Sequence, residues 1–183
     1  MRAPAFPEIA MRALLDSLYR LSGALAAVGM IFTLVMVAAG VFTRPFNIYL
    51  PGTDDYAGYA MAACGFLALA YTFKHGEHIR VSLVIERLGP RMRRVAEWFA
   101  HGAGVVVASM LAWYAVRLAW QSHEFDEISQ GIDATPLWIP QLSMAVGAVI
   151  LLVAVLDDFV QVSLGREPQR LARADAEEMA HME

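Results

Sequence analysis

Few side chains in this sequence are suited to catalysis or to cofactor binding, and the histidines are among them. His75, His78 and His101 would lie at a similar depth if residues 95–120 form a membrane helix. Histidines held at one depth on facing helices ligate haem iron in the membrane anchors of electron-transfer enzymes. His75 and His78, however, belong to a charged segment typical of a hydrated loop. A haem- or quinone-binding anchor is therefore kept as the alternative hypothesis, and no cofactor or metal site is assigned.

Acidic pairs stand at the ends of two apolar segments. Asp54 and Asp55 precede one of them, where carboxylates interact favourably with a helix dipole. Contact with a partner protein is the second interpretation of this pair. Asp157 and Asp158 follow the last apolar segment, oppose the dipole there, and predict a cationic neighbour such as Arg91 or Arg94. No nucleophile with an adjacent base is recognisable, so the chain is not predicted to be an enzyme.

Composition places this chain in a membrane. Apolar residues make up 58% of it, charged residues 17%, and the mean hydropathy is +0.47, which exceeds what a soluble domain normally carries. A membrane helix needs about 20 apolar residues, and four segments qualify. The predicted fold is an all-α membrane protein whose four transmembrane helices cover residues 21–43, 56–73, 95–120 and 134–156.

Flanking segments have their own patterns. In residues 1–20, charged residues recur every four positions, which predicts an N-terminal amphipathic helix lying at the membrane interface. Residues 81–88 repeat apolar side chains at helical spacing and predict a short interfacial helix between spans two and three. The four-span domain therefore covers residues 21–158, and residues 159–183 form a polar cytoplasmic tail.

Positive charges predict the orientation of the chain. Lysine and arginine near span ends are retained in the cytoplasm. Twelve of the 14 basic residues lie in the N-terminal segment, in the loop between spans two and three, and in the C-terminal tail, whereas only Arg44 and Arg117 lie on the other side. Both termini are therefore predicted to be cytoplasmic, with the chain in a bacterial inner membrane.

Small residues recur on the third span. Ala100, Gly104, Ala108 and Ala112 repeat every four residues and form one smooth face, the kind of surface on which membrane helices pack. Two interpretations are open: packing inside this chain, or a groove for a helix of another subunit. No ionisable residue stands at the predicted mid-depth of a span, where a transporter of charged solutes needs one. Transport by this chain alone is not expected.

Two motifs resemble the small membrane subunit, or Q-type subunit, of tripartite ATP-independent periplasmic (TRAP) transporters. The first has Asp54 and Asp55 before span two and the run Gly76–Val81 after it, although Ser82 replaces the acid that commonly ends the family's run. The second is the run Thr135–Pro140 at the start of span four, where Thr135 is the expected N-cap and Pro136 the first helical residue. The resemblance covers roughly residues 20–160.

The resemblance implies a function. Such a chain is a non-catalytic small permease subunit that scaffolds the large subunit of a sodium-driven, binding-protein-dependent importer of organic acids. Its implied partners are a large multi-span permease, a periplasmic substrate-binding protein and membrane lipid, without nucleic acid, and the partner subunit uses the sodium gradient. The candidate subunit-interface residues are Asp54, Asp55, His78, Arg80, Gly104, Ala108, Pro136 and Trp138.

Overall fold

Four long helices make up most of the described chain. The computed structural model describes residues 6–48, 50–74, 90–131 and 133–163. Its long helices are α1 (Phe6–Thr43), α2 (Thr53–Lys74), α4 (Pro90–Glu124) and α5 (Trp138–Ser163), and the short 3-10 helix η1 (Arg44–Phe46) follows α1. Each long helix contains a segment long and apolar enough to cross a membrane, which confirms the predicted fold class. The interfacial helix predicted at residues 81–88 and the chain beyond residue 163 lie outside the described residues.

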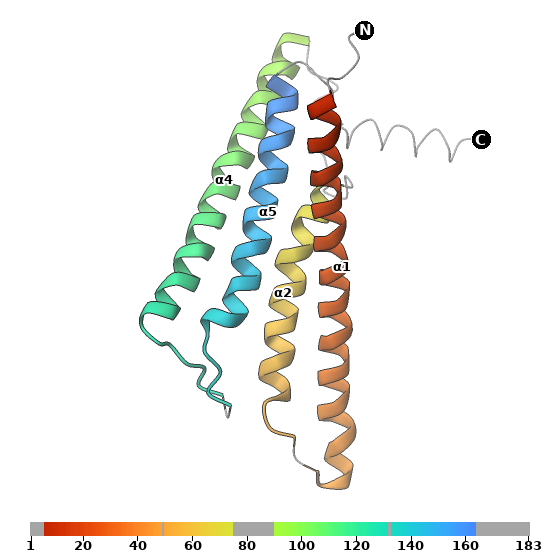
Figure 1. The fold of residues 1–183 in the computed structure, drawn as a ribbon, viewed down its shortest axis with the longest axis vertical. Coiled ribbons are helices and arrows are strands. Elements are labelled where there is room, and N and C mark those ends of the chain that lie inside the picture. Colours follow the sequence, from red (N-terminus) through yellow and green to blue (C-terminus); the bar gives the residue numbers. More distant parts are fainter. Residues whose placement is uncertain (1–5, 49, 75–89, 132, 164–183) are drawn as a thin grey trace, which may run out of the picture.

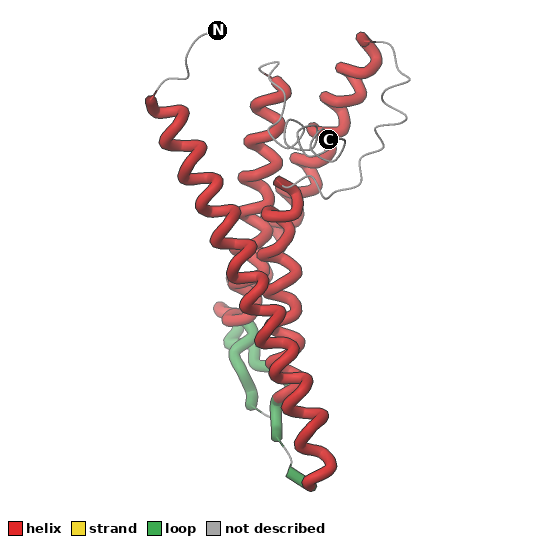
Figure 2. Tube along the Cα trace, turned by 90° about the vertical axis from the view of Figure 1, so that its right-hand side faces the viewer, coloured by secondary structure: helices red, strands yellow, loops and turns green. Residues whose placement is uncertain are grey.

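The helices stand side by side in the order α1, α2, α5, α4, which differs from their order in the chain (Figure 1). Two antiparallel hairpins, α1–α2 and α4–α5, meet where α2 packs against α5, so α1 and α4 form the outer edges. The described loop residues of both hairpins lie together at one end (Figure 2). We call this end the loop end. The opposite end, where α1 begins and α5 finishes, is the terminal end.

The first helix is longer than predicted. The sequence predicted a separate interfacial helix up to residue 20, but α1 is one helix of 38 residues that continues through that boundary. Such a helix is about 57 Å long at 1.5 Å per residue. Between Pro7 and Gly23 there is neither a proline nor a glycine to end it. Leu15, Leu18 and Tyr19 pack with apolar residues of the neighbouring helices, so this apolar stripe contacts protein within the chain.

The fourth span begins later than predicted. Its helix α5 starts at Trp138, because the preceding residues form an extended loop in which Ile128 and Pro136 pair as an isolated antiparallel bridge. The Thr135 carbonyl accepts a hydrogen bond from the Ser129 amide at 2.8 Å. Thr135 is therefore not the helix N-cap, and Pro136 is not its first residue. Pro140 now falls in the first turn, where a missing N–H removes no helical hydrogen bond.

Close approach of backbones holds the central pair of helices together. An added Cβ atom on Gly147 of α5 would lie 2.5 Å from the carbonyl carbon of Phe66 in α2. Without hydrophobic attraction between helices in lipid, such contacts supply much of the packing energy. In the outer pair, Gly23 lies against the Tyr71 ring, and the Ser22 hydroxyl donates a 2.5 Å hydrogen bond to the Leu67 carbonyl. Small residues therefore position both neighbours of α2.

We expect Gly147→Ala to destabilise the chain, because its Cβ atom would force α5 away from the α2 backbone. Overpacking of this kind costs about 1–3 kcal/mol. The matched control is Gly65→Ala in α2, where an added Cβ meets no atom within 4 Å. Thermal unfolding in detergent should show a lower Tm for Gly147→Ala and no decrease for Gly65→Ala. Equal Tm values for the two variants would contradict the close approach.

Candidate functional sites at the two ends of the helices

A buried group of charges joins α2 to α5 at the terminal end. The Lys74 ammonium donates hydrogen bonds to Asp157 Oδ2 at 2.5 Å and to Asp158 Oδ1 at 2.9 Å. Only 8% of the Lys74 side chain and 1% of the Asp158 side chain are exposed. Lys74 is the last residue of α2, and the two aspartates lie near the end of α5. These three residues form the salt bridges found among the described side chains.

Two uncharged side chains complete this group. Gln161 Nε2 donates to Asp157 Oδ2 at 3.0 Å, one helical turn along α5. The Lys74 ammonium also lies 5.4 Å from the centre of the Tyr19 ring, within the range of a cation–π interaction. Tyr19 comes from α1 and is buried. We call these five residues the lysine cluster, and they connect three of the four helices.

The lysine cluster supplies the cation that the sequence predicted beside the two aspartates. That cation is Lys74; the side chains of the other expected partners, Arg91 and Arg94, are not described. Because α5 continues to Ser163, Asp157 and Asp158 lie more than one turn before its last residue and oppose the helix dipole less than expected. From the sequence alone, Lys74 is one of the basic residues that follow the second apolar segment.

Chemically, the lysine cluster is suited to fixing helices in place. It contains no nucleophile beside a base, and among the described residues no group of three or more His, Cys, Asp or Glu could hold a metal ion. Desolvation offsets most of the attraction in a buried ion pair, whereas loss of one partner is strongly destabilising. The cluster therefore opposes any arrangement of α2 and α5 that separates these charges.

Of the three histidines in the haem hypothesis, the described residues include His101 alone. His101 is buried in α4. His123 lies at the loop end, where its ring is 5.3 Å from that of Trp138. His75 and His78 lie outside the described residues.

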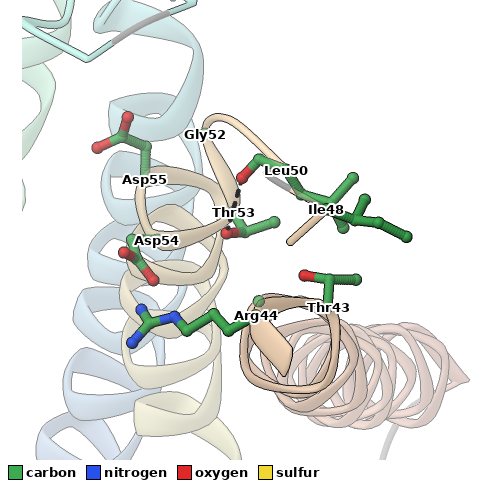
Figure 3. Close-up of a pocket in the computed structure, with 9 residues that line it drawn as sticks. Thr43, Arg44, Ile48, Leu50, Gly52, Thr53, Asp54 and Asp55 are labelled. Atoms are coloured by element: carbon green, nitrogen blue, oxygen red, sulfur yellow. Dashed lines mark hydrogen bonds between the residues drawn. The ribbon is translucent and has the colours of Figure 1, made fainter. Parts of the chain in front are cut away.

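A polar pocket lies at the loop end between α1 and α2. It has a volume of about 230 Å³, and Figure 3 shows the Arg44 side chain extending toward Asp54 across it. Asp54 and Asp55 stand in the first turn of α2, as predicted, where they interact favourably with the helix dipole. Asp54 is exposed and Asp55 is half-buried. The pocket is lined by Gly40, Thr43, Arg44, Ile48, Leu50, Gly52, Thr53, Asp54 and Asp55.

The loops of the two hairpins contact each other through carboxylates placed against glycines. An added Cβ on Gly131 would collide with the Asp55 carboxylate, and one on Gly52 would lie 2.6 Å from Asp133 Oδ2. Gly52 also has a φ of +77°, which favours glycine. The two hairpins are therefore also in contact at the loop end. The sequence did not predict this contact, and the two glycines are the feature that could have indicated it.

The small-residue face of α4 is used largely within the chain. Ala108 is 3% exposed, and Ala112 belongs to an alanine cluster shared with α5. Of the two interpretations left open, internal packing accounts for these alanines. Gly104 is half-buried, with Val155 of α5 as the neighbour of an added Cβ at 3.7 Å. Gly104 therefore also faces α5, although less tightly.

Two of the remaining interface candidates have a described position, and both lie at the loop end. Pro136 is exposed on the loop between α4 and α5, and Trp138 is half-buried at the start of α5. Both lie at the loop end with Asp54 and Asp55. His78 and Arg80 lie outside the described residues. The structure thus brings four of the eight candidates to one end of the molecule.

A comparison with known families gives a match over most of the chain. The family model described as "Tripartite ATP-independent periplasmic transporters, DctQ component" matches residues 33–165, which include α2, α4, α5 and the end of α1. This match confirms the resemblance inferred from the two motifs. A comparison with curated proteins found no match. The family is one of transporter components and is not catalytic, and with four apolar helices the chain is a multi-pass inner-membrane protein.

We expect Lys74→Met to destabilise the fold by about 3–5 kcal/mol, because it leaves two partly or fully buried carboxylates without a cation. The double variant Lys74→Met/Asp158→Leu should recover part of this loss, since it removes the more deeply buried charge. The exposed Asp54→Asn serves as the control. Equilibrium unfolding in mixed detergent micelles gives the free energies. A Lys74→Met variant as stable as the wild type would show that the lysine cluster does not hold the helices.

Proposed function

We infer that this chain, which belongs to the DctQ family of small permease subunits of TRAP transporters, scaffolds the large permease subunit of its transporter. The transporter is a sodium-driven importer that receives organic acids from a periplasmic binding protein. In this assignment the large subunit carries the solute and the sodium ions. The small subunit holds a fixed shape beside it in the membrane.

The distribution of ionisable residues along the spans is the main support for this proposal. In the four described spans, every Asp, Glu, Lys, Arg and His lies within the first or last eight residues of its span. Carriers of charged solutes place such groups near the bilayer midplane, often beside interrupted helices. The described spans instead have apolar middles and continuous helices. Such spans support a neighbour and offer no path for a charged solute.

The shape of the helix row also supports a scaffolding role. α2 and α5 contact each other at mid-depth and at the terminal end, and at the loop end α2 contacts the loop that precedes α5. The helices α1 and α4 present apolar outer faces. The most apolar window of α1 is only 6% buried within the chain. These outer faces are available to the large subunit and to membrane lipid. The large subunit is a partner that the family implies.

We propose that the termini are cytoplasmic, on the basis of the positive charges. The loop end then faces the periplasm and carries exposed carboxylates, including Asp54, Glu124 and Asp126. With Asp55, Pro136 and Trp138 they form a surface for a periplasmic partner, and a basic patch on the binding protein would complement their charge. His78 and Arg80, which follow α2 in the sequence, are proposed to contact the large subunit or lipid phosphates. The haem or quinone alternative gains no support from the family match.

Reconstitution in liposomes tests the proposal. The large subunit, the binding protein and this chain together should accumulate the organic acid that co-purifies with the binding protein when a sodium gradient is applied. This chain alone should accumulate none, because its spans lack ionisable groups at mid-depth. Omitting it should abolish uptake by the other two. Sodium-linked uptake by this chain alone, or full uptake without it, would overturn the scaffolding role.

A further inference from the structure

An apolar groove runs along the exposed side of α5 and has no part in the proposed scaffolding role. Its floor includes Leu142, Val146 and Val149 of α5, and Val116 of α4 lies along one side. Leu18 of α1 lies at the end beside Ile150. The groove has a volume of about 610 Å³. Val146 and Val149 are substantially exposed within the chain, so no described segment of this protein covers the floor. We call this feature the α5 groove.

The α5 groove is about as long as one leaflet of the bilayer. It begins at Trp138 and reaches Ile150, where Leu18 and Tyr19 of α1 pack against α5 and close it. Twelve residues of helix span about 18 Å, whereas the hydrocarbon core is about 30 Å thick. A partner's transmembrane helix lying in the groove would have to cross the whole core, and it would collide with α1 halfway. An acyl chain from the leaflet at the loop end, in contrast, is about as long as the groove.

The open mouth of the α5 groove carries side chains of the kinds that contact lipid headgroups. Trp120, His123 and Trp138 form its rim at the loop end, and indole rings favour this interfacial depth. Arg117 stands one turn before Trp120 on α4, and Glu124 follows His123; all three of Arg117, His123 and Glu124 are exposed. Both signs of charge therefore lie within about two turns of helix. This arrangement complements a phosphate and an amine carried by one headgroup.

We propose that the α5 groove binds one zwitterionic phospholipid, with an amine-bearing headgroup, from the leaflet at the loop end. An acyl chain lies along Leu142, Val146 and Val149. Arg117 and His123 contact the phosphate, and Glu124 contacts the amine. An anionic headgroup is disfavoured because carboxylates outnumber cations at this end of the molecule.

The test uses the full-length chain in nanodiscs made of equal parts phosphatidylethanolamine and phosphatidylglycerol, followed by native mass spectrometry. The wild type should retain one phosphatidylethanolamine. Val146→Trp and Leu142→Trp, which fill the groove from exposed positions, should retain about tenfold less. Val107→Trp, exposed on α4 outside the groove, is the matched control and should retain as much as the wild type. Circular dichroism verifies that each variant is folded.

Headgroup recognition has a separate readout. Glu124→Gln should reduce the preference for phosphatidylethanolamine over phosphatidylglycerol while the groove still accepts an acyl chain. Equal retention by Val146→Trp, Leu142→Trp and the wild type would overturn the proposal, as would retention without headgroup preference. The same measurement is made on the chain assembled with its large subunit. A phospholipid held by the isolated chain but absent from the assembly would mean that protein covers the α5 groove, which also contradicts the proposal.

Discussion

The contact between α2 and α5 joins two helical hairpins, and the arrangement of the other helices depends on it. α1 reaches the rest of the described molecule mainly through α2, and α4 through α5. Lipid provides little hydrophobic drive for helices to associate, so the contact relies on specific geometry. Gly147 permits close backbone approach at mid-depth, the lysine cluster fixes the terminal end, and carboxylates against glycines fix the loop end.

The placement of charge explains how this fold fits a supporting role. A buried cluster of one lysine and two aspartates in a membrane protein suggests a solute or proton path when it lies near the midplane. Here it lies at the end of α2, and each of its charges has a partner within the chain. The charges therefore hold helices together. The middle of each described span is left apolar, which suits a subunit whose neighbour performs the transport.

Much of the fold could be predicted from the sequence, because span length, charge and aromatic residues indicate whether lipid or water surrounds a helix. The four spans and the positions of Asp54 and Asp55 were confirmed. The N-terminal boundary was wrong because an amphipathic stripe looks the same whether it faces a membrane surface or, as Leu18 and Tyr19 do, a neighbouring helix. The start of α5 was wrong because the pairing of Ile128 with Pro136 outweighs the local N-cap signal of Thr135.

Contacts between distant parts of the chain could not be predicted in this way. Lys74 and Asp158 are 84 residues apart, and several arginines stood at an equally plausible depth. The spatial order of the helices could not be predicted either, since small residues occur on every span and do not specify which helix they contact. The alanines of α4 could have faced another subunit, but the structure shows them against α5. Only the three-dimensional arrangement distinguishes these cases.

We expect the α2–α5 junction to stay rigid while the neighbouring subunit moves its solute. Distances between spin labels measure this directly, with cysteines replacing the exposed Met61 in α2 and Leu156 in α5 and with Cys64→Ala removing the natural thiol. In the assembled transporter, we expect a single distance between the two labels, and it should be the same with and without sodium and substrate. A shifted distance, or a second population that appears with sodium and substrate, would contradict it.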